Sequence, residues 1–286
     1  MPERPDLEVL VPRLRAALVG AQIAAVETPL PVLLRATVRP ADVLPGLTVA
    51  QVSRHGGFVS WSLTGAQELR LAIHPMLAGR FSLPPAGARP PRDLGLSLRF
   101  TDDRVLWFRD EEQMAKVWVV PQAEEDRIIG WSPIGLDALD PAVFTLERFV
   151  ALARRRRDQV KVFLLDHGAI DHLGNAYADE VMYAARVHPK ARVSELSPEA
   201  LARLHAAIPA TLRRAIDEIT RRQPALDEKV RDFLIVRNRK GRPCPACGDT
   251  IRVCGIHGHD AFFCPTCQPD QKARTLVDWR RPIGSD

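Results

Sequence analysis

The spacing of apolar and polar positions gives the first 130 residues the pattern of a β domain. An opening stretch from Asp6 to Leu18 has apolar residues at helical spacing, although Pro12 weakens a helix there. Short alternating or β-branched runs follow, separated by Pro, Gly and Asp: QIAAVE, LTVAQVS, FVSWSL, LRLAIH, LSLRF, RVLWF and KVWVV. Many short strands with turn signals indicate a sandwich or barrel rather than a parallel sheet.

Beyond residue 130 the apolar period becomes helical. Four segments carry it: FTLERFVALARRRR, QVKVFLLDH, NAYADEVMYAARV and SPEALARLHAAIPATLRRAIDEITRR. Ser197 followed by Pro198 predicts the start of the longest helix, with the serine as cap and the proline in the first turn. The last fifty or so residues are expected to form loops and a ribbon.

Composition is that of an ordinary globular protein. The 286 residues are 46% apolar and 26% charged, and the length is sufficient for two domains. No apolar run approaches the roughly 18 residues that cross a bilayer, and MPERPDLEVL has acids where a signal peptide has basic residues. We therefore expect a cytoplasmic protein.

The net charge of +5 is unevenly distributed. Residues 151–286 contain 24 Lys and Arg against 17 Asp and Glu, whereas residues 1–150 contain 16 against 18. The runs Arg154–Arg157 and VRNRKGRP suit phosphate contacts, although each is equally compatible with a solvated surface.

All five cysteines lie in the segment CPACGDTIRVCGIHGHDAFFCPTC. Cys244 and Cys247 form one Cys-x-x-Cys pair, and Cys264 and Cys267 form another after 16 intervening residues. Each short spacing lets a tight turn place two thiolates on one tetrahedral ion, and the interval suits a β-hairpin. We predict a structural Zn²⁺ ion bound by these four thiolates, with Cys254 as a hairpin residue.

Two histidines in this segment, His257 and His259, could in principle replace a cysteine, but the symmetry of the pairs argues against it. A closed four-thiolate site leaves no open position for a substrate. The ion is therefore expected to hold the hairpin rather than to catalyse a reaction.

Three segments together resemble one family. The opening Met1–Glu8 resembles the P-E-L-P-E-V-E start of formamidopyrimidine-DNA glycosylases, relatives of endonuclease VIII. DHLGNAYADEVMYAARVHP resembles their helix-two-turns-helix signature, and the segment ending in FFCPTCQ resembles their zinc finger. The resemblance implies an α+β multidomain protein with double-stranded DNA, containing damaged bases or abasic sites, held between its domains.

The resemblance also implies domain limits. We expect a catalytic β-sandwich over residues 1–128, a helix-two-turns-helix domain over 129–235, a zinc finger over 236–270 and a tail over 271–286. We expect the protein to act as a monomer.

Pro2 and Glu3 gain a chemical meaning from this resemblance. After removal of Met1, Pro2 would carry a secondary amine whose pKa lies below that of lysine, so part of it is neutral near pH 7. Such an amine can attack the sugar C1′, expel the base and form a Schiff base that promotes strand cleavage. Glu3 beside it can shuttle protons to the opening sugar.

The resemblance assigns DNA contacts to Asn175 and Lys161. Asn175 matches an asparagine that binds a backbone phosphate at a helix start, and Lys161 matches a lysine that reaches a phosphate near the lesion. Tyr177, Asp179 and Glu180 belong to the same motif, but packing and capping explain them equally well.

Several positions depart from the family pattern. Gly57 stands where a lysine is usual, and Leu77, next to Met76, stands where a methionine usually enters the duplex. Leucine remains an apolar wedge. His259 stands where an arginine usually contacts phosphate, and a histidine would contribute less and in a pH-dependent manner.

A further departure follows Asp110. The family commonly shows D-P-R-R-F-G, whereas this chain has Glu111, Glu112, Gln113 and Met114. Two glutamates facing a phosphate-lined groove would oppose DNA binding.

These observations leave three hypotheses. The first is a bifunctional glycosylase and abasic-site lyase of base excision repair, acting on damaged, oxidised bases. The second is a DNA-binding member specific for abasic or distorted DNA, with base excision lost or reduced. The third, an RNA-binding module, leaves Pro2 and Glu3 unexplained. The preferred lesion depends on a base pocket that one sequence does not define.

Overall fold

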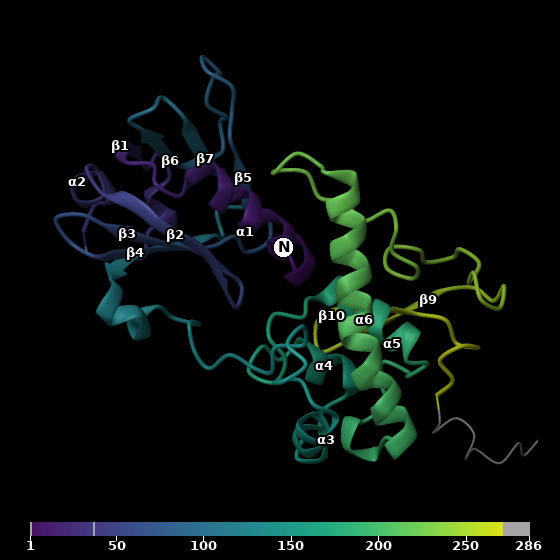
Figure 1. Cartoon of the computed structure of the whole chain (residues 1–286). Helices are drawn as coiled ribbons and strands as arrows, with labels where there is room; N and C mark the ends of the chain where they lie inside the picture. Colours follow the sequence, from purple (N-terminus) through teal and green to yellow (C-terminus); the bar gives the residue numbers. More distant parts are fainter. Residues whose placement is uncertain (1, 37, 271–286) are drawn as a thin grey trace, which may run out of the picture. The chain divides into compact units, whose positions relative to one another are not determined.

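The computed structural model describes residues 2–36 and 38–270 (Figure 1). The chain divides into two compact units, Met1–Gly135 with Leu212–Asp232, and Leu136–Thr211 with Phe233–Asp286. The segment Leu212–Asp232, expected in the helical domain, therefore belongs to the first unit. The expected tail 271–286 lies outside the described residues.

The first unit begins with a helix and continues with short strands, as the sequence predicts. Its helices are α1 (Arg4–Leu18) and α2 (Pro40–Val43). Its strands are β1 (Ile23–Glu27), β2 (Thr48–His55), β3 (Phe58–Thr64), β4 (Leu69–His74), β5 (Arg80–Ser82), β6 (Leu94–Phe100), β7 (Val105–Arg109) and β8 (Lys116–Pro121). Of these strands, β5 was not predicted from the sequence, because its three residues are too few to show an alternating pattern.

The strands form two antiparallel four-stranded sheets, ordered β1-β6-β7-β5 and β2-β3-β4-β8. Side chains from both sheets and from α1 share one buried apolar core, which confirms the predicted β-sandwich. Trp61, Leu71 and Phe108 are among its fully buried members. Strand β8 is apolar on both faces, because Val117 and Val119 enter this core while Trp118 packs in a second cluster.

Helix α1 starts at Arg4, two residues earlier than its apolar period suggests. The Asp6 carboxylate accepts a hydrogen bond from the Glu3 amide at 2.7 Å, which satisfies one of the donors at the helix start. Pro12 does not end the helix, because the apolar face that includes Leu7 and Leu14 is fully buried in the sandwich core.

The second unit contains the remaining helices and a β-hairpin. The helices are α3 (Leu146–Arg154), α4 (Val160–Leu165), α5 (Asn175–Ala184) and α6 (Pro198–Arg222), whose residues from Leu212 onward belong to the first unit. The Ser197 hydroxyl accepts a hydrogen bond from the Ala200 amide at 3.2 Å, which confirms the predicted cap of α6. None of the described helices has the length and apolar character needed to cross a membrane.

Strands β9 (Arg252–Ile256) and β10 (His259–Phe263) form the predicted hairpin. His257 and Gly258 connect them and both have positive φ angles, 46° and 81°. This geometry matches the right-handed twist of a two-residue hairpin turn. His259 is the first residue of β10 and is exposed.

Truncation of the sandwich core is expected to lower the free energy of unfolding. Leu71 has no exposed surface, so Leu71→Ala should cost about 2–5 kcal/mol in urea denaturation. Val19, which is 46% exposed after α1, provides the control: Val19→Ala should change the value by about 0.5 kcal/mol or less. Equal losses from the two substitutions would contradict the assignment of Leu71 to a tightly packed core.

Candidate functional site

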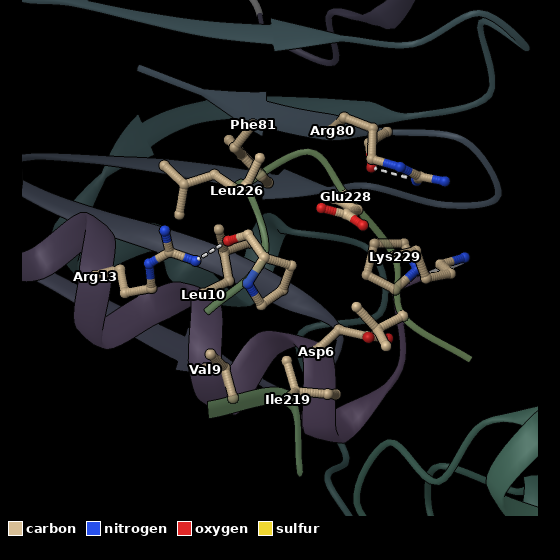
Figure 2. A pocket seen from close by; sticks show the side chains of 15 residues that line it. Asp6, Val9, Leu10, Arg13, Arg80, Phe81, Ile219, Leu226, Glu228 and Lys229 are labelled. Carbon is tan, nitrogen blue, oxygen red and sulfur yellow. Dashed lines mark hydrogen bonds between the residues drawn. The ribbon is translucent and has the colours of Figure 1, made fainter. Parts of the chain in front are cut away.

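A pocket in the first unit contains the beginning of the chain (Figure 2). Its lining comes from α1, from the start of β5 and from the end of α6 with the loop that follows it. Leu10, Phe81 and Leu226 give it an apolar part. Its charged groups are Asp6, Arg13, Arg80, Glu228 and Lys229.

Pro2 lines this pocket, and both Pro2 and Glu3 are buried. Glu3 retains 6% of its surface. A chain terminus is usually frayed, whereas this one is held by the Glu3–Asp6 hydrogen bond at the start of α1. Of the two residues expected to be catalytic, Pro2 therefore borders a space that a small group can enter, and Glu3 follows it in the buried start of the chain.

Asp6 has a second partner in Arg231, from the loop after α6. Arg231 Nη1 donates to Asp6 Oδ1 at 2.7 Å, and Arg231 Nη2 donates to Asp6 Oδ2. Both side chains are 16% exposed. Two parallel hydrogen bonds between a guanidinium and a carboxylate restrict the orientation of both groups.

Lys229 adds an amine to the same pocket. Burial, together with the nearby guanidinium groups of Arg80 and Arg231, lowers the pKa of Lys229, although Asp6 opposes this effect. The pocket therefore contains a lysine that is more readily neutral than an exposed one. Sequence analysis missed this lysine and Arg231, because nothing in the loop sequence shows that it folds back onto α1.

A turn in the first unit exposes Leu77. The Gly79 amide donates to the Pro75 carbonyl at 2.8 Å, and a Cβ on Gly79 would lie 2.4 Å from that oxygen. Only glycine fits this closure. Met76 has a φ of 47°, and Leu77 at the tip is 54% exposed, which is the property required of an apolar wedge.

The loop after β7 presents the acidic departure from the family pattern. Asp110 is fully buried, and its carboxylate accepts from the Ala115 amide at 2.6 Å. Glu111, Glu112 and Gln113 are exposed at the tip of this loop, and Met114 is 47% exposed.

Gly57 lies in the two-residue turn between β2 and β3, where His55 pairs with Phe58. Its neighbour Gly56 has a φ of 53°. The His55 ring stacks on Trp131 with centroids 3.7 Å apart. This turn therefore presents no cationic side chain at the position where the family usually has a lysine.

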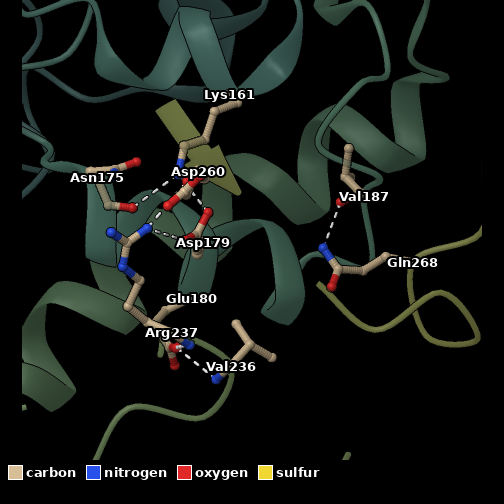
Figure 3. A network of polar contacts seen from close by, with 9 residues as sticks. All are labelled: Lys161, Asn175, Asp179, Glu180, Val187, Val236, Arg237, Asp260 and Gln268. Carbon is tan, nitrogen blue, oxygen red and sulfur yellow. Dashed lines mark hydrogen bonds and ion pairs between the residues drawn. The ribbon is translucent and has the colours of Figure 1, made fainter. Parts of the chain in front are cut away.

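The second unit contains a buried network of charges (Figure 3). Lys161 and Asp179 have no exposed side-chain surface, and Lys161 Nζ lies 2.5 Å from Asp179 Oδ1. The same ammonium donates to the Asn175 carbonyl at 3.0 Å. Arg237 Nη1 donates to the other Asp179 oxygen at 2.9 Å and to the Asp260 carbonyl in β10 at 3.1 Å.

Helix α5 also holds the segment that leads to the hairpin. The Glu180 carboxylate is 2% exposed and accepts hydrogen bonds from the amides of Ile235, Val236 and Arg237 at 2.7, 2.8 and 3.0 Å. Tyr177 is fully buried. For these motif residues the structure favours the packing and anchoring explanation over direct contact with a ligand.

Asn175 is the first residue of α5 and is partly exposed. Its Oδ1 is buried and has no hydrogen-bond partner among the described residues. The amide donors at the start of a ten-residue helix favour an anion there.

His259 is exposed on β10, next to Asp260 in sequence. Arg237 donates a hydrogen bond to the Asp260 carbonyl, and its guanidinium lies 4.9 Å from the Phe262 ring centroid.

Four cysteines form a candidate metal centre in the second unit. The sulfur atoms of Cys244, Cys247, Cys264 and Cys267 all lie within 4.8 Å of one another, an arrangement that could hold a metal ion. Among the described residues, Cys254 does not belong to this group. The predicted ligand set therefore comes together in space.

The thiol chemistry of the group favours a bound cation. Burial, which raises the pKa of the Cys244 thiol, is outweighed by hydrogen bonds from the Tyr183 hydroxyl and from backbone amides, which lower this pKa to about 6. Burial and the neighbouring thiols raise the pKa of Cys267. Four crowded sulfurs are thus difficult to ionise together, and a divalent cation removes that difficulty.

Comparison with known proteins places both units in one family. Residues 1–117 match the model of the formamidopyrimidine-DNA glycosylase N-terminal domain, and residues 134–223 match the model of its H2TH domain. The formamidopyrimidine-DNA glycosylase of Pelotomaculum thermopropionicum is 32% identical over 276 residues, covering 94% of this chain and 99% of that protein. The chain belongs to the formamidopyrimidine-DNA glycosylase family.

Other members of the formamidopyrimidine-DNA glycosylase family agree with this assignment. The Roseiflexus protein of the same name is 32% identical over 94% of this chain and all of that protein. The structure of Lactococcus lactis Fpg with DNA containing an abasic site has a TM-score of 0.85 at 25% identity, covering 94% of this chain and 100% of that one. The complex of that protein with N7-benzyl-Fapy-dG DNA gives a TM-score of 0.86.

The predicted site residues of this family member lie in separate units. Pro2, Glu3 and Leu77 belong to the first, whereas Lys161 and Asn175 belong to the second. The second unit also contains His259 and the four clustered cysteines.

Removing one cysteine of the cluster is expected to abolish metal binding. Cys247→Ser should lower the metal content from one ion per chain to near zero in plasma mass spectrometry, because three thiolates do not complete a closed site. Cys254→Ser, outside the group, should keep the full content. Retention of metal by the Cys247 variant would contradict the ligand set.

The amine of Lys229 is expected to titrate below the ordinary lysine value of about 10.4, because burial disfavours its charged form. Reductive methylation with a ¹³C label followed by NMR titration measures this pKa, and Lys229→Arg assigns the signal. A midpoint at or above the ordinary value would show that the pocket does not desolvate the amine.

Proposed function

We propose that this protein is a bifunctional DNA glycosylase and abasic-site lyase that removes damaged, oxidised bases through a Schiff base on Pro2. The observation that carries the proposal is the placement of Pro2, which lines the pocket, next to the buried Glu3, whose amide is held by Asp6 at the start of α1. Family membership supports it, since relatives carry the name formamidopyrimidine-DNA glycosylase.

The proposed chemistry needs Met1 to be removed so that Pro2 becomes the terminal amine. Its nitrogen lone pair attacks C1′ of the damaged nucleoside, the bond from C1′ to the base breaks, and the departing base takes up the proton that the Pro2 amine loses. Glu3 donates a proton to the sugar ring oxygen as the ring opens, which leaves an iminium between Pro2 and C1′. Loss of a proton from C2′ then expels the 3′ phosphate.

We propose that Asn175 binds a backbone phosphate. It is partly exposed at the first position of α5, where helix amides favour an anion. For Lys161 we propose a different role from the direct phosphate contact implied by the resemblance. Its ammonium is fully buried between Asp179 and the Asn175 carbonyl. We propose that it fixes the backbone of Asn175 through the hydrogen bond to this carbonyl.

Leu77 is proposed as the apolar wedge that fills the gap left by a flipped nucleotide. Its exposure at the tip of a rigid turn suits insertion between bases. We also propose that His259 contacts phosphate from β10, where it is exposed. A histidine there would bind best when protonated, so the second elimination should be weaker than with an arginine.

Zn²⁺ is the ion we propose for the four-cysteine centre. Cys244, Cys247, Cys264 and Cys267 provide four soft ligands in two tight turns, which suits tetrahedral zinc. The ion would hold the β9–β10 hairpin against α5 and would take no part in the reaction.

A second candidate function is the recognition of abasic or distorted DNA with base excision lost or reduced. The exposed Glu111 and Glu112, and the absence of a cationic side chain at Gly57, favour it. The protein would then bind lesion DNA without forming a covalent intermediate.

Borohydride trapping on duplexes with an abasic site or an oxidised base distinguishes the two functions. Mature protein should form a covalent adduct, and Glu3→Gln should slow its formation by about 10²–10⁴-fold. Protein that retains Met1 is the matched control, because its Pro2 nitrogen is in a peptide bond. Lesion binding without any adduct from the mature protein would favour the second function.

Neutralising the acidic loop tip is expected to strengthen DNA binding. Removing two negative charges in Glu111→Gln/Glu112→Gln should lower the dissociation constant for lesion duplexes most strongly at low salt. Glu68→Gln, an exposed glutamate on another turn of the same unit, serves as control. Equal effects from both variants would mean that the tip does not face the DNA.

A further inference from the structure

The loop after α6 is attached to the rest of the first unit at several points. Arg13 Nη1 donates to the Pro224 carbonyl at 2.6 Å, and Arg109 Nη2 lies 3.2 Å from Asp227 Oδ2. The third attachment is the pair of hydrogen bonds from Arg231 to Asp6. Of these three attachments, the one from Arg231 reaches Asp6, whose carboxylate accepts a hydrogen bond from the Glu3 amide.

Asp6 connects the loop with the chain terminus. Its Oδ2 accepts from the Glu3 amide at 2.7 Å and also from Arg231 Nη2. Its Oδ1 accepts from Arg231 Nη1 at 2.7 Å. The guanidinium therefore fixes the orientation of the carboxylate that holds the Glu3 backbone, and Glu3 is directly bonded to Pro2.

Other cations in the pocket compete for the same carboxylate. Asp6 interacts electrostatically with Arg80 and with Lys229, both of which line the pocket. Without Arg231, the partly buried Asp6 carboxylate would keep the Glu3 amide but lose the cation paired with it, and a buried charge without a counter-ion is costly. Rotation toward Arg80 or Lys229 would draw it away from the Glu3 amide.

We propose that Arg231 is a positioning residue that sets the place of Pro2 and Glu3 through Asp6. The proposal rests on the proposed function of Pro2 as nucleophile and adds a loop residue to it. Arg231 acts through its two hydrogen bonds to Asp6. Its effect is on the fraction of molecules in which the amine points into the pocket, so it acts on the chemical step rather than on DNA affinity.

Single-turnover trapping at saturating abasic-site duplex tests this role. Arg231→Ala should slow adduct formation by about 10²-fold, the usual effect of displacing a reacting group by about 1 Å, while the dissociation constant changes less than threefold. Arg231→Lys, which restores a positive charge but not the two-bond geometry, should recover part of the rate. Asp6→Asn/Arg231→Ala should be no slower than the slower single variant, because both substitutions break one linkage.

Arg109→Ala is the matched control, because it loosens the same loop at Asp227 without touching Asp6. It should keep the rate of the unmodified protein, and thermal melting of each variant reports whether it is folded. A rate for Arg231→Ala within twofold of the unmodified protein, or equal losses from Arg231→Ala and Arg109→Ala, would overturn the proposal. Absence of an adduct from the unmodified mature protein would instead refute the proposed function itself.

Discussion

A reaction at a terminal amine requires that the end of the chain be held still, and most protein termini are not. Here the requirement is met in two stages. The apolar face of α1 is buried in the core shared by both sheets, which fixes the helix. The Asp6 carboxylate then fixes the residue just before the helix, and Arg231 fixes the carboxylate. The sandwich, the helix and the loop after α6 thus converge on the position of two residues.

In the second unit, buried carboxylates hold helix α5 and the segment that leads to the hairpin together. Buried carboxylates, not apolar contacts alone, join α5 to the hairpin segment: Glu180 accepts three consecutive amides, and Asp179 bridges Lys161 and Arg237. Such networks are costly unless every member is paired, and breaking one partner leaves a buried charge. They therefore favour one arrangement of helix and hairpin over nearby alternatives.

Much of the fold was predictable because it depends on local patterns. Alternation, β-branched residues and turn signals identified the strands other than β5, and Ser197 identified the start of α6. The cysteine spacing identified four sulfurs that do come together. Each of these signals is contained in a few neighbouring residues.

The site was less predictable because its contacts join distant positions. Arg231 and Asp6 are 225 residues apart, and Lys161 and Asp179 are 18 apart on different helices. Family resemblance implied a phosphate contact for Lys161, and no sequence pattern indicated that its side chain is buried and donates to the Asn175 carbonyl. The lowered pKa of Lys229 depends on desolvation and on neighbouring guanidinium groups, neither of which a linear pattern reveals.

Two positions in the turn from Pro75 to Gly79 should differ strongly in the substitutions that evolution tolerates. At Gly79 even one added carbon would collide with the Pro75 backbone, so selection should remove nearly every substitution there. At Leu77 the side chain is mostly exposed, and replacement by another apolar residue leaves the turn intact. Descendants of this chain can therefore vary the shape of the tip while inheriting the same rigid support beneath it.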